Sequence, residues 1–167
     1  MSRGFVKEDD LEHAGTDLPE RPISEHPNYV TPLGLAQLKQ QAQALEAERL
    51  QLAPRKEDPT VSQKLAVIER DCRYFQARLE SVILVEPAAQ AKQSVLFGAT
   101  VQVEDEDGNQ HQYTIVGEDE ADLNLNKVSY VSPIARALIG RKVGDSVTWQ
   151  RPAGNINLEI LDIHYAL

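Results

Sequence analysis

Two adjacent acids, Glu57 and Asp58, lie in a short polar turn that spans Ala53–Pro59. Carboxylates bind Mg²⁺, and an ion held in this way can stabilise the attacking and leaving oxygens of a displacement at phosphorus. Arg55 and Lys56 precede the two acids directly and offset part of their charge. Asp58 could also cap a helix that follows the turn. The pair therefore has two interpretations, metal-directing acids or ordinary solvated charges.

The segments on both sides of this turn carry a heptad pattern. Steps of three and four residues connect Leu35, Leu38, Ala42, Leu45, Arg49 and Leu52 before the turn, and Val61, Leu65, Ile68, Cys72, Phe75, Leu79 and Val82 after it. A repeat of 3.5 residues keeps one seam of a helix facing a partner helix. Residues 29–85 are therefore predicted to form an antiparallel coiled-coil hairpin with the two acids at its tip.

The ends of both helices have local signals. The first helix is expected from Pro32 to about Leu52, with Thr31 as its N-cap, and the second from Pro59 to about Ile83. The polar faces are expected to be solvated, because both signs of charge alternate on them: Glu69, Arg70, Arg73, Arg78 and Glu80.

From Phe97 onward the apolar pattern changes to a period of two, which is typical of half-buried strands. Asp107-Gly108 predicts a hairpin turn, and Ser132 is expected to cap a short helix that starts at Pro133. Strands are expected at residues 99–104, 112–116, 127–131, 146–150 and 156–163. The predicted fold class is α+β, a helical hairpin followed by an antiparallel sheet domain with one short helix.

The predicted domain order is an N-terminal extension, residues 1–28, the hairpin, a linker, residues 86–96, and a C-terminal domain, residues 97–167. The extension is expected to be disordered and acidic, because it has few large apolar residues and contains three prolines. No apolar run is long enough to span a bilayer, and the first residues lack a signal-peptide core. We therefore expect a cytoplasmic protein without membrane contact.

The formal charge of −9 is concentrated in the extension and the C-terminal half. An acidic chain without a basic stripe is a poor candidate for autonomous nucleic-acid binding. His13, His26, His111 and His164 have no metal-ligand spacing, so no intrinsic cofactor is expected. Cys72 falls on the helix seam and is interpreted as a small buried hydrophobe.

The C-terminal half contains one long recognisable motif. Residues 131–145, Val-Ser-Pro-Ile-Ala-Arg-Ala-Leu-Ile-Gly-Arg-Lys-Val-Gly-Asp, resemble the Ser-Pro-x-Ala-Arg-Ala-Leu-x-Gly-Lys-x-x-Gly-Asp signature of the Gre family of bacterial transcript-cleavage factors. Further segments resemble the same family, its GreB type in particular: Tyr29–Gly34, Ile68–Glu80, Phe97–Val101, Pro152–Gly154 and Ile160–Tyr165.

This resemblance implies a partner, bacterial RNA polymerase. In the family an FKBP-like C-terminal domain docks at the rim of the polymerase secondary channel, and the coiled coil enters the channel. The polymerase contact is carried over to Ser132, Pro133 and Ile134. Acidic tip residues of the family help hold a second Mg²⁺ at the polymerase's own catalytic site, which makes Glu57 and Asp58 the metal-directing candidates. The chain would be a monomer without catalytic residues of its own, and would contact RNA or DNA only within the polymerase complex.

Three features depart from the family pattern. Cleavage-stimulating members carry a Gly-Asp-x-x-Glu-Asn-type tip, whereas this chain has Arg55-Lys-Glu-Asp-Pro59. The hairpin is shorter by about one heptad per helix, which removes roughly 10 Å of reach. Val131 stands where the family has Asp or Asn. We therefore expect a regulator of elongation whose stimulation of cleavage is weak or absent, and the alternative is a secondary-channel inhibitor without cleavage activity.

Two other classes of function remain open from the sequence. An FKBP-like fold could be a peptide-binding module or a prolyl isomerase, which requires a concave pocket lined by aromatic residues. A coiled-coil adaptor or dimer would act without any contact to the polymerase.

Overall fold

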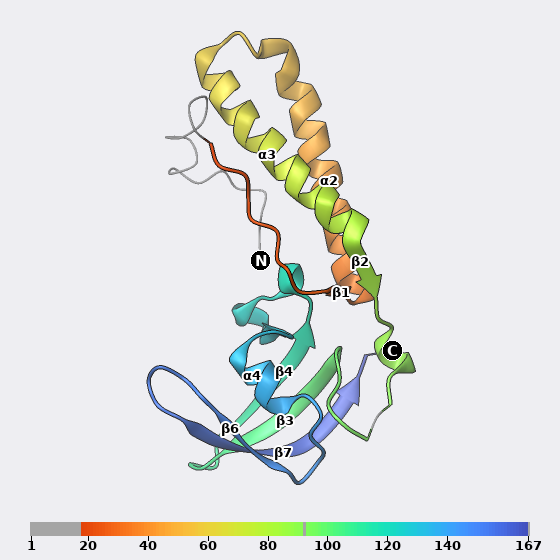
Figure 1. Cartoon of the computed structure of the whole chain (residues 1–167), viewed down its shortest axis with the longest axis vertical. Coiled ribbons are helices and arrows are strands. Elements are labelled where there is room, and N and C mark those ends of the chain that lie inside the picture. Colours follow the sequence, from red (N-terminus) through yellow and green to blue (C-terminus); the bar gives the residue numbers. More distant parts are fainter. Residues whose placement is uncertain (1–17, 92, 167) are drawn as a thin grey trace. The chain divides into compact units, whose positions relative to one another are not determined.

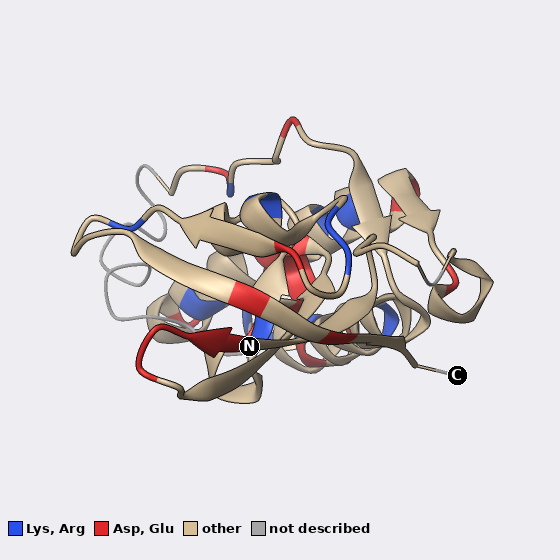
Figure 2. Cartoon of the chain, turned by 90° about the horizontal axis from the view of Figure 1, so that it is seen from below, with Lys and Arg blue, Asp and Glu red and all other residues tan. Residues whose placement is uncertain are grey.

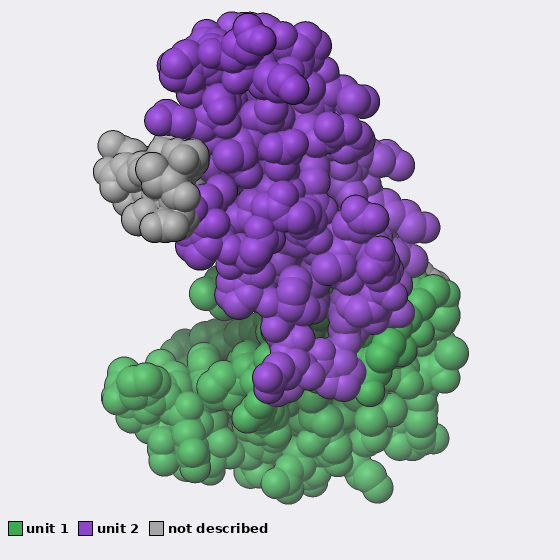
Figure 3. Space-filling model, turned by 45° about the horizontal axis from the view of Figure 1, so that its top comes forward, with its two compact units in different colours: residues 1, 29–34, 83–167 green, residues 2–28, 35–82 purple. Residues whose placement is uncertain are grey.

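The computed structural model describes residues 18–91 and 93–166, so residues 1–17 of the predicted extension lie outside the described part of the chain. The described residues form two compact units, which Figure 3 colours separately. The sheet unit holds residues 29–34 and 83–166, and the helical unit holds residues 18–28 and 35–82. The chain is therefore a mixed helix and sheet protein, as the α+β expectation requires.

The helical unit is built on two helices, α2 (Pro32–Leu52) and α3 (Pro59–Ser81), which Figure 1 draws side by side. The first three residues of α2 belong to the sheet unit. Both helices begin where the sequence predicts, because each has a proline in its first turn and a capping side chain before it. The short connection contains a 3₁₀ turn, η1 (Ala53–Arg55).

Six of the residues at the predicted heptad positions are buried and the others are half-buried; the buried ones are Leu38, Leu45, Val61, Leu65, Ile68 and Phe75. Cys72 is half-buried, and burial raises the pKa of its thiol. Nearby Glu46 and Arg49, both on α2, also affect that pKa, so the facing surfaces of the two helices are close at this level. The heptad residues thus form the apolar interior of the helical unit.

Part of the charged surface of α3 is buried, so the expectation that its polar face is solvated is wrong there. Arg70 and Asp71 are 7% and 3% exposed, and Arg78 is only 2% exposed. Arg70 bonds to Asp71, and Arg78 bonds to Asn28, which lies fifty residues earlier in the chain. Charged side chains are buried when they are paired, and part of the pairing here comes from residues 18–28.

The sheet unit contains a five-stranded sheet in the order β5-β4-β3-β7-β6. The strands are β3 (Ala99–Asp105), β4 (Gln110–Val116), β5 (Lys127–Ser129), β6 (Ser146–Trp149) and β7 (Ile156–Tyr165). All neighbours are antiparallel except β4 and β5, which pair in parallel. The parallel pair departs from the predicted antiparallel sheet, and it arises because the segment between the two strands crosses over through η3 (Glu118–Glu120) and η4 (Leu123–Leu125).

Two short strands lie outside this sheet, β1 (Asn28–Val30) and β2 (Val82–Leu84), and they pair with each other. A 3₁₀ turn, η2 (Pro87–Ala89), follows β2. The helix α4 (Pro133–Leu138) packs Ile134, Ala135 and Leu138 into the core of the sheet unit. Strand residues supply most of the rest of that core: Val101, Val103, Ile115, Val128, Val147, Leu158 and Ile160. No helix in residues 18–91 or 93–166 has the length and hydrophobicity that a bilayer span requires.

One buried carboxylate holds the start of α2 within the sheet unit. Glu120 is 7% exposed, and its Oε1 accepts a hydrogen bond of 2.6 Å from the Thr31 hydroxyl. Its Oε2 lies 3.4 Å from Lys127 Nζ. The Thr31 hydroxyl in turn accepts from the backbone N–H of Gly34 at 3.0 Å. A Cβ at Gly34 would come within 2.6 Å of Glu120 Oε1, so the carboxylate occupies the space beside that glycine.

Replacing Glu120 with alanine should destabilise the sheet unit by about 1–3 kcal/mol, because the buried Thr31 hydroxyl loses its acceptor. Urea unfolding followed by the fluorescence of Trp149, the single tryptophan, measures the effect. Glu106→Ala is the matched control, because Glu106 is exposed, and it should shift stability by less than about 0.5 kcal/mol. Equal shifts in the two variants would contradict a structural role for Glu120.

Candidate functional site

The tip between α2 and α3 is compact and exposed. The N–H of Lys56 donates to the Ala53 carbonyl at 3.3 Å, and the N–H of Asp58 donates to the Arg55 carbonyl at 3.0 Å. Residues 54–60 are all exposed to solvent. Asp58 is the N-cap of α3, since its Oδ1 accepts from the Thr60 N–H at 3.0 Å. Glu57 therefore has its carboxylate free of the capping role that occupies Asp58.

The tip acids do not by themselves form a metal site. Within residues 18–91 and 93–166, no group of three or more His, Cys, Asp or Glu side chains is arranged to hold a metal ion. One oxygen of Asp58 is already used as a helix cap, and Glu57 adds only one further carboxylate. A magnesium ion at this tip would need most of its ligands from another molecule.

The motif residues 132–134 lie at the start of α4 and differ in accessibility. Ser132 is the N-cap, because its hydroxyl oxygen accepts from the Ala135 N–H at 3.3 Å. Pro133 is exposed, whereas Ile134 is 4% exposed and belongs to the core. Val131, which precedes the cap, is half-buried, and its N–H donates to the Ser129 hydroxyl at 3.2 Å. Of the three motif residues, Ser132 and Pro133 can be reached by a partner.

An apolar groove of about 600 Å³ lies beside these two residues. Its lining comes from the crossover segment, from β5, from the start of α4, and from the end of β6 with the loop that follows it: Ala121, Leu123, Lys127, Val128, Ser129, Ser132, Pro133, Ile134, Trp149, Gln150, Arg151, Pro152 and Ala153. Leu123 is 82% exposed, although it is a large apolar residue. The Arg151 guanidinium lies 5.5 Å from the centre of the Trp149 ring, so a cation borders the apolar surface.

Sequence reasoning did not single out this groove. Leu123 and Leu125 stand among acidic and amide residues in the crossover segment, and two leucines in such a polar loop were the available signal. Trp149 is half-buried, packs against the core of the sheet unit and also lines the groove. Figure 2 shows acidic and basic residues in separate short segments along the ribbon, consistent with the absence of a basic stripe in the sequence.

The aromatic residues needed for an isomerase pocket are engaged with one another. Tyr29, Phe97 and Tyr130 form a mutual cluster with ring centroids 5.3–5.8 Å apart. Tyr113 makes an edge contact with Trp149 at 6.1 Å. Of these rings only Trp149 lines the apolar groove, and one ring does not make the aromatic-lined pocket that an isomerase requires, so the geometry does not favour the isomerase alternative.

Comparison with known proteins decides the family. The family model described as "Transcription elongation factor, GreA/GreB, C-term" matches residues 90–165. The transcription elongation factor GreB of Neisseria meningitidis serogroup B is 34% identical over 165 residues, which cover 85% of this chain and 96% of that protein. The chain belongs to the Gre family of transcription elongation factors. Gre factors stimulate the transcript cleavage of RNA polymerase itself and are not enzymes in their own right.

Other Gre proteins match over shorter stretches or with lower identity. GreA of Alkalilimnicola ehrlichii is 46% identical over 101 residues, 59% of this chain, and the match spans 64% of that GreA. Among solved structures, the GreA factor homolog 1 of Thermus thermophilus is 21% identical with a TM-score of 0.40, covering 83% of this chain and 99% of that one. The GreA/GreB factor of Nitrosomonas europaea is 22% identical with a TM-score of 0.41, covering 82% and 98%.

Replacing Asp58 with alanine should destabilise the helical unit of this Gre factor by about 1 kcal/mol, because the Thr60 N–H loses its cap. Asp58→Asn should restore most of this loss, since asparagine caps a helix about as well as aspartate. Urea unfolding followed by far-ultraviolet circular dichroism measures both variants. Equal losses in the two variants would show that charge, and not capping, is what Asp58 contributes.

Proposed function

We propose that this Gre factor binds RNA polymerase at its secondary channel through the sheet unit and inserts the hairpin into the channel, where it modulates elongation. The observation that carries the proposal is the apolar groove beside Ser132 and Pro133, the motif residues that a partner can reach. Exposed apolar surface of this kind is typical of protein interaction sites. The place of action would be the bacterial cytoplasm, and the factor would act as a monomer.

In this proposal the docking surface is wider than the motif. Pro133 and the exposed Leu123 supply apolar contact, and Trp149 with Arg151 forms an aromatic and cationic border. Tryptophan and arginine are the residues that most often dominate binding energy at interfaces. Ile134 supports this surface from the core and adds little direct contact, because it is 4% exposed.

The helical unit would act as the inserted arm. We interpret α2 and α3 as an antiparallel coiled coil, which the burial of the heptad residues supports, and the sheet unit as an FKBP-like domain. Glu57 and Asp58 remain the candidates for sharing a magnesium ion with the polymerase. Their stimulation of cleavage would be weak, because they offer two adjacent carboxylates of which one caps α3.

Replacing Leu123 with serine should weaken binding to RNA polymerase at least fivefold, because the variant removes exposed apolar area from the docking surface without touching the core. Fluorescence anisotropy of the labelled factor against core polymerase measures the dissociation constant. Val143→Ser is the matched control, since Val143 is also exposed, at 56%, but does not line the groove. Equal weakening in the two variants would contradict docking through the groove.

A transcript-cleavage assay on stalled, backtracked polymerase tests the tip. We expect the native chain to bind the complex and to stimulate cleavage weakly, and Glu57→Gln/Asp58→Asn to remove that residual stimulation while binding is retained. Asp58→Asn is used because asparagine keeps the helix cap. Robust cleavage by the native chain that the double variant loses would contradict the proposal that the tip stimulates cleavage only weakly. Stimulation that persists in the double variant would show that the two acids do not contribute to it.

A further inference from the structure

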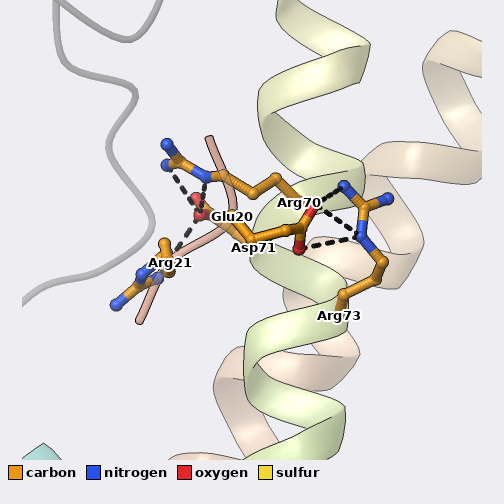
Figure 4. Close-up of polar contacts among 5 residues, drawn as sticks. All are labelled: Glu20, Arg21, Arg70, Asp71 and Arg73. Atoms are coloured by element: carbon orange, nitrogen blue, oxygen red, sulfur yellow. Dashed lines mark hydrogen bonds and ion pairs between the residues drawn. The ribbon is translucent and has the colours of Figure 1, made fainter. Parts of the chain in front are cut away.

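The outer face of α3, formed by Arg70, Asp71, Arg73, Tyr74 and Arg78, contacts a segment that lies about fifty residues earlier in the chain. This N-terminal segment, residues 18–28, lies along the face, and Figure 4 shows the polar contacts of its Glu20 and Arg21. This face adjoins the apolar interior between the helices, since the Arg21 guanidinium also lies 5.4 Å from the centre of the ring of Phe75, a buried heptad residue. Its residues are distinct from those that line the groove proposed to bind the polymerase.

The first contact recognises an acid. Arg73 Nε lies 3.1 Å from both carboxylate oxygens of Glu20, and Arg73 Nη2 bonds to the same carboxylate. This hydrogen bond from Arg73 is the main reason that the pKa of Glu20 is lowered. Both side chains are more than half exposed, so the pair adds geometric selectivity for a carboxylate more than it adds stability.

The second contact recognises a base at the next position. Arg21 Nη1 lies 3.3 Å from Asp71 Oδ1, and its guanidinium lies 3.8 Å above the Tyr74 ring. Asp71 is buried and is also held by Arg70, whose Nη2 lies 2.8 Å from the same oxygen. A cation that is stacked on an aromatic ring and paired with a buried carboxylate is bound more selectively than an exposed ion pair.

The third contact closes the far end of the segment. Asn28 Nδ2 donates to the Arg78 carbonyl at 2.8 Å, and Arg78 Nη2 donates to Asn28 Oδ1 at 2.8 Å. Asn28 Nδ2 also lies 3.2 Å from the Ser81 hydroxyl. Asn28 and Arg78 are both buried, so these bonds are made away from water.

The sequence of an acid followed by a base along the segment indicates that the ligand of this face is a peptide. The face binds a carboxylate and, at the adjacent residue, a cation, and a nucleic-acid backbone cannot supply that cation. Pro19 and Pro22 flank the pair, and proline restricts both itself and the residue before it to extended backbone. An extended Pro-Glu-Arg-Pro peptide therefore loses less conformational entropy on binding than a flexible one.

We propose that the outer face of α3 is a recognition site for an extended peptide in which an acid is followed by an arginine. The N-terminal segment is its resident occupant, and a separate peptide of the same pattern displaces it. Because Glu20 and Arg21 of the segment occupy Arg73 and Asp71, the site is available to another chain only after the segment has left.

Spin labels on the full chain test the occupancy. Cysteines placed by Glu25→Cys and Gln76→Cys in a Cys72→Ser background put one label on the segment and one on α3, at exposed positions. Pulsed electron resonance should give a narrow distance distribution, and Arg21→Glu should broaden it. Arg55→Glu, a matched reversal at the exposed tip, should leave it narrow. A broad distribution in the otherwise native chain would overturn the proposal.

Peptides added to the same labelled chain test the recognition. At millimolar concentration a synthetic peptide of residues 18–28 should broaden the distance distribution. A peptide of identical composition, with the residues at positions 20 and 21 exchanged, should not. No displacement by the first peptide, or equal displacement by both, would overturn the proposal that the face recognises an acid followed by an arginine.

Discussion

The hydrogen bond between Thr31 and the buried carboxylate of Glu120 is the contact on which the start of the hairpin depends. The Thr31 hydroxyl also accepts from the Gly34 N–H, so the side chain that caps α2 is itself held by the carboxylate. Gly34 leaves room for the carboxylate, since a Cβ there would displace Glu120 Oε1 from its present position. The crossover segment that carries Glu120 also carries Leu123, so one irregular loop both holds the first turn of α2 and lines the groove.

The sequence predicted the structural features that are set by residues close together in the chain. The caps at Thr31, Asp58 and Ser132, the bounds of α2 and most strands follow from residue types within a few positions. The burial of Arg70 and Arg78 could not be predicted in this way, because a mixed-charge helix face is identical in sequence whether or not a distant segment covers it. The partner of Arg78 is fifty residues away, and only the folded chain brings the two together.

The candidate site also has one part that the sequence predicts and one part that it does not. The tip acids were visible in the sequence because two carboxylates in a proline-bounded turn are unusual, but the capping role of Asp58 limits what they can bind. The groove could not be predicted from the sequence because its lining comes from stretches that are separated along the chain. Under the proposed function, this Gre factor is a regulator whose effect depends on where it binds more than on its own chemistry.

A structure of the factor bound to stalled RNA polymerase tests the central claim most directly. The account predicts that the groove beside Ser132 and Pro133 contacts the rim of the secondary channel and that the hairpin lies inside the channel. Binding elsewhere on the polymerase, or a hairpin that stays outside the channel, would contradict the account.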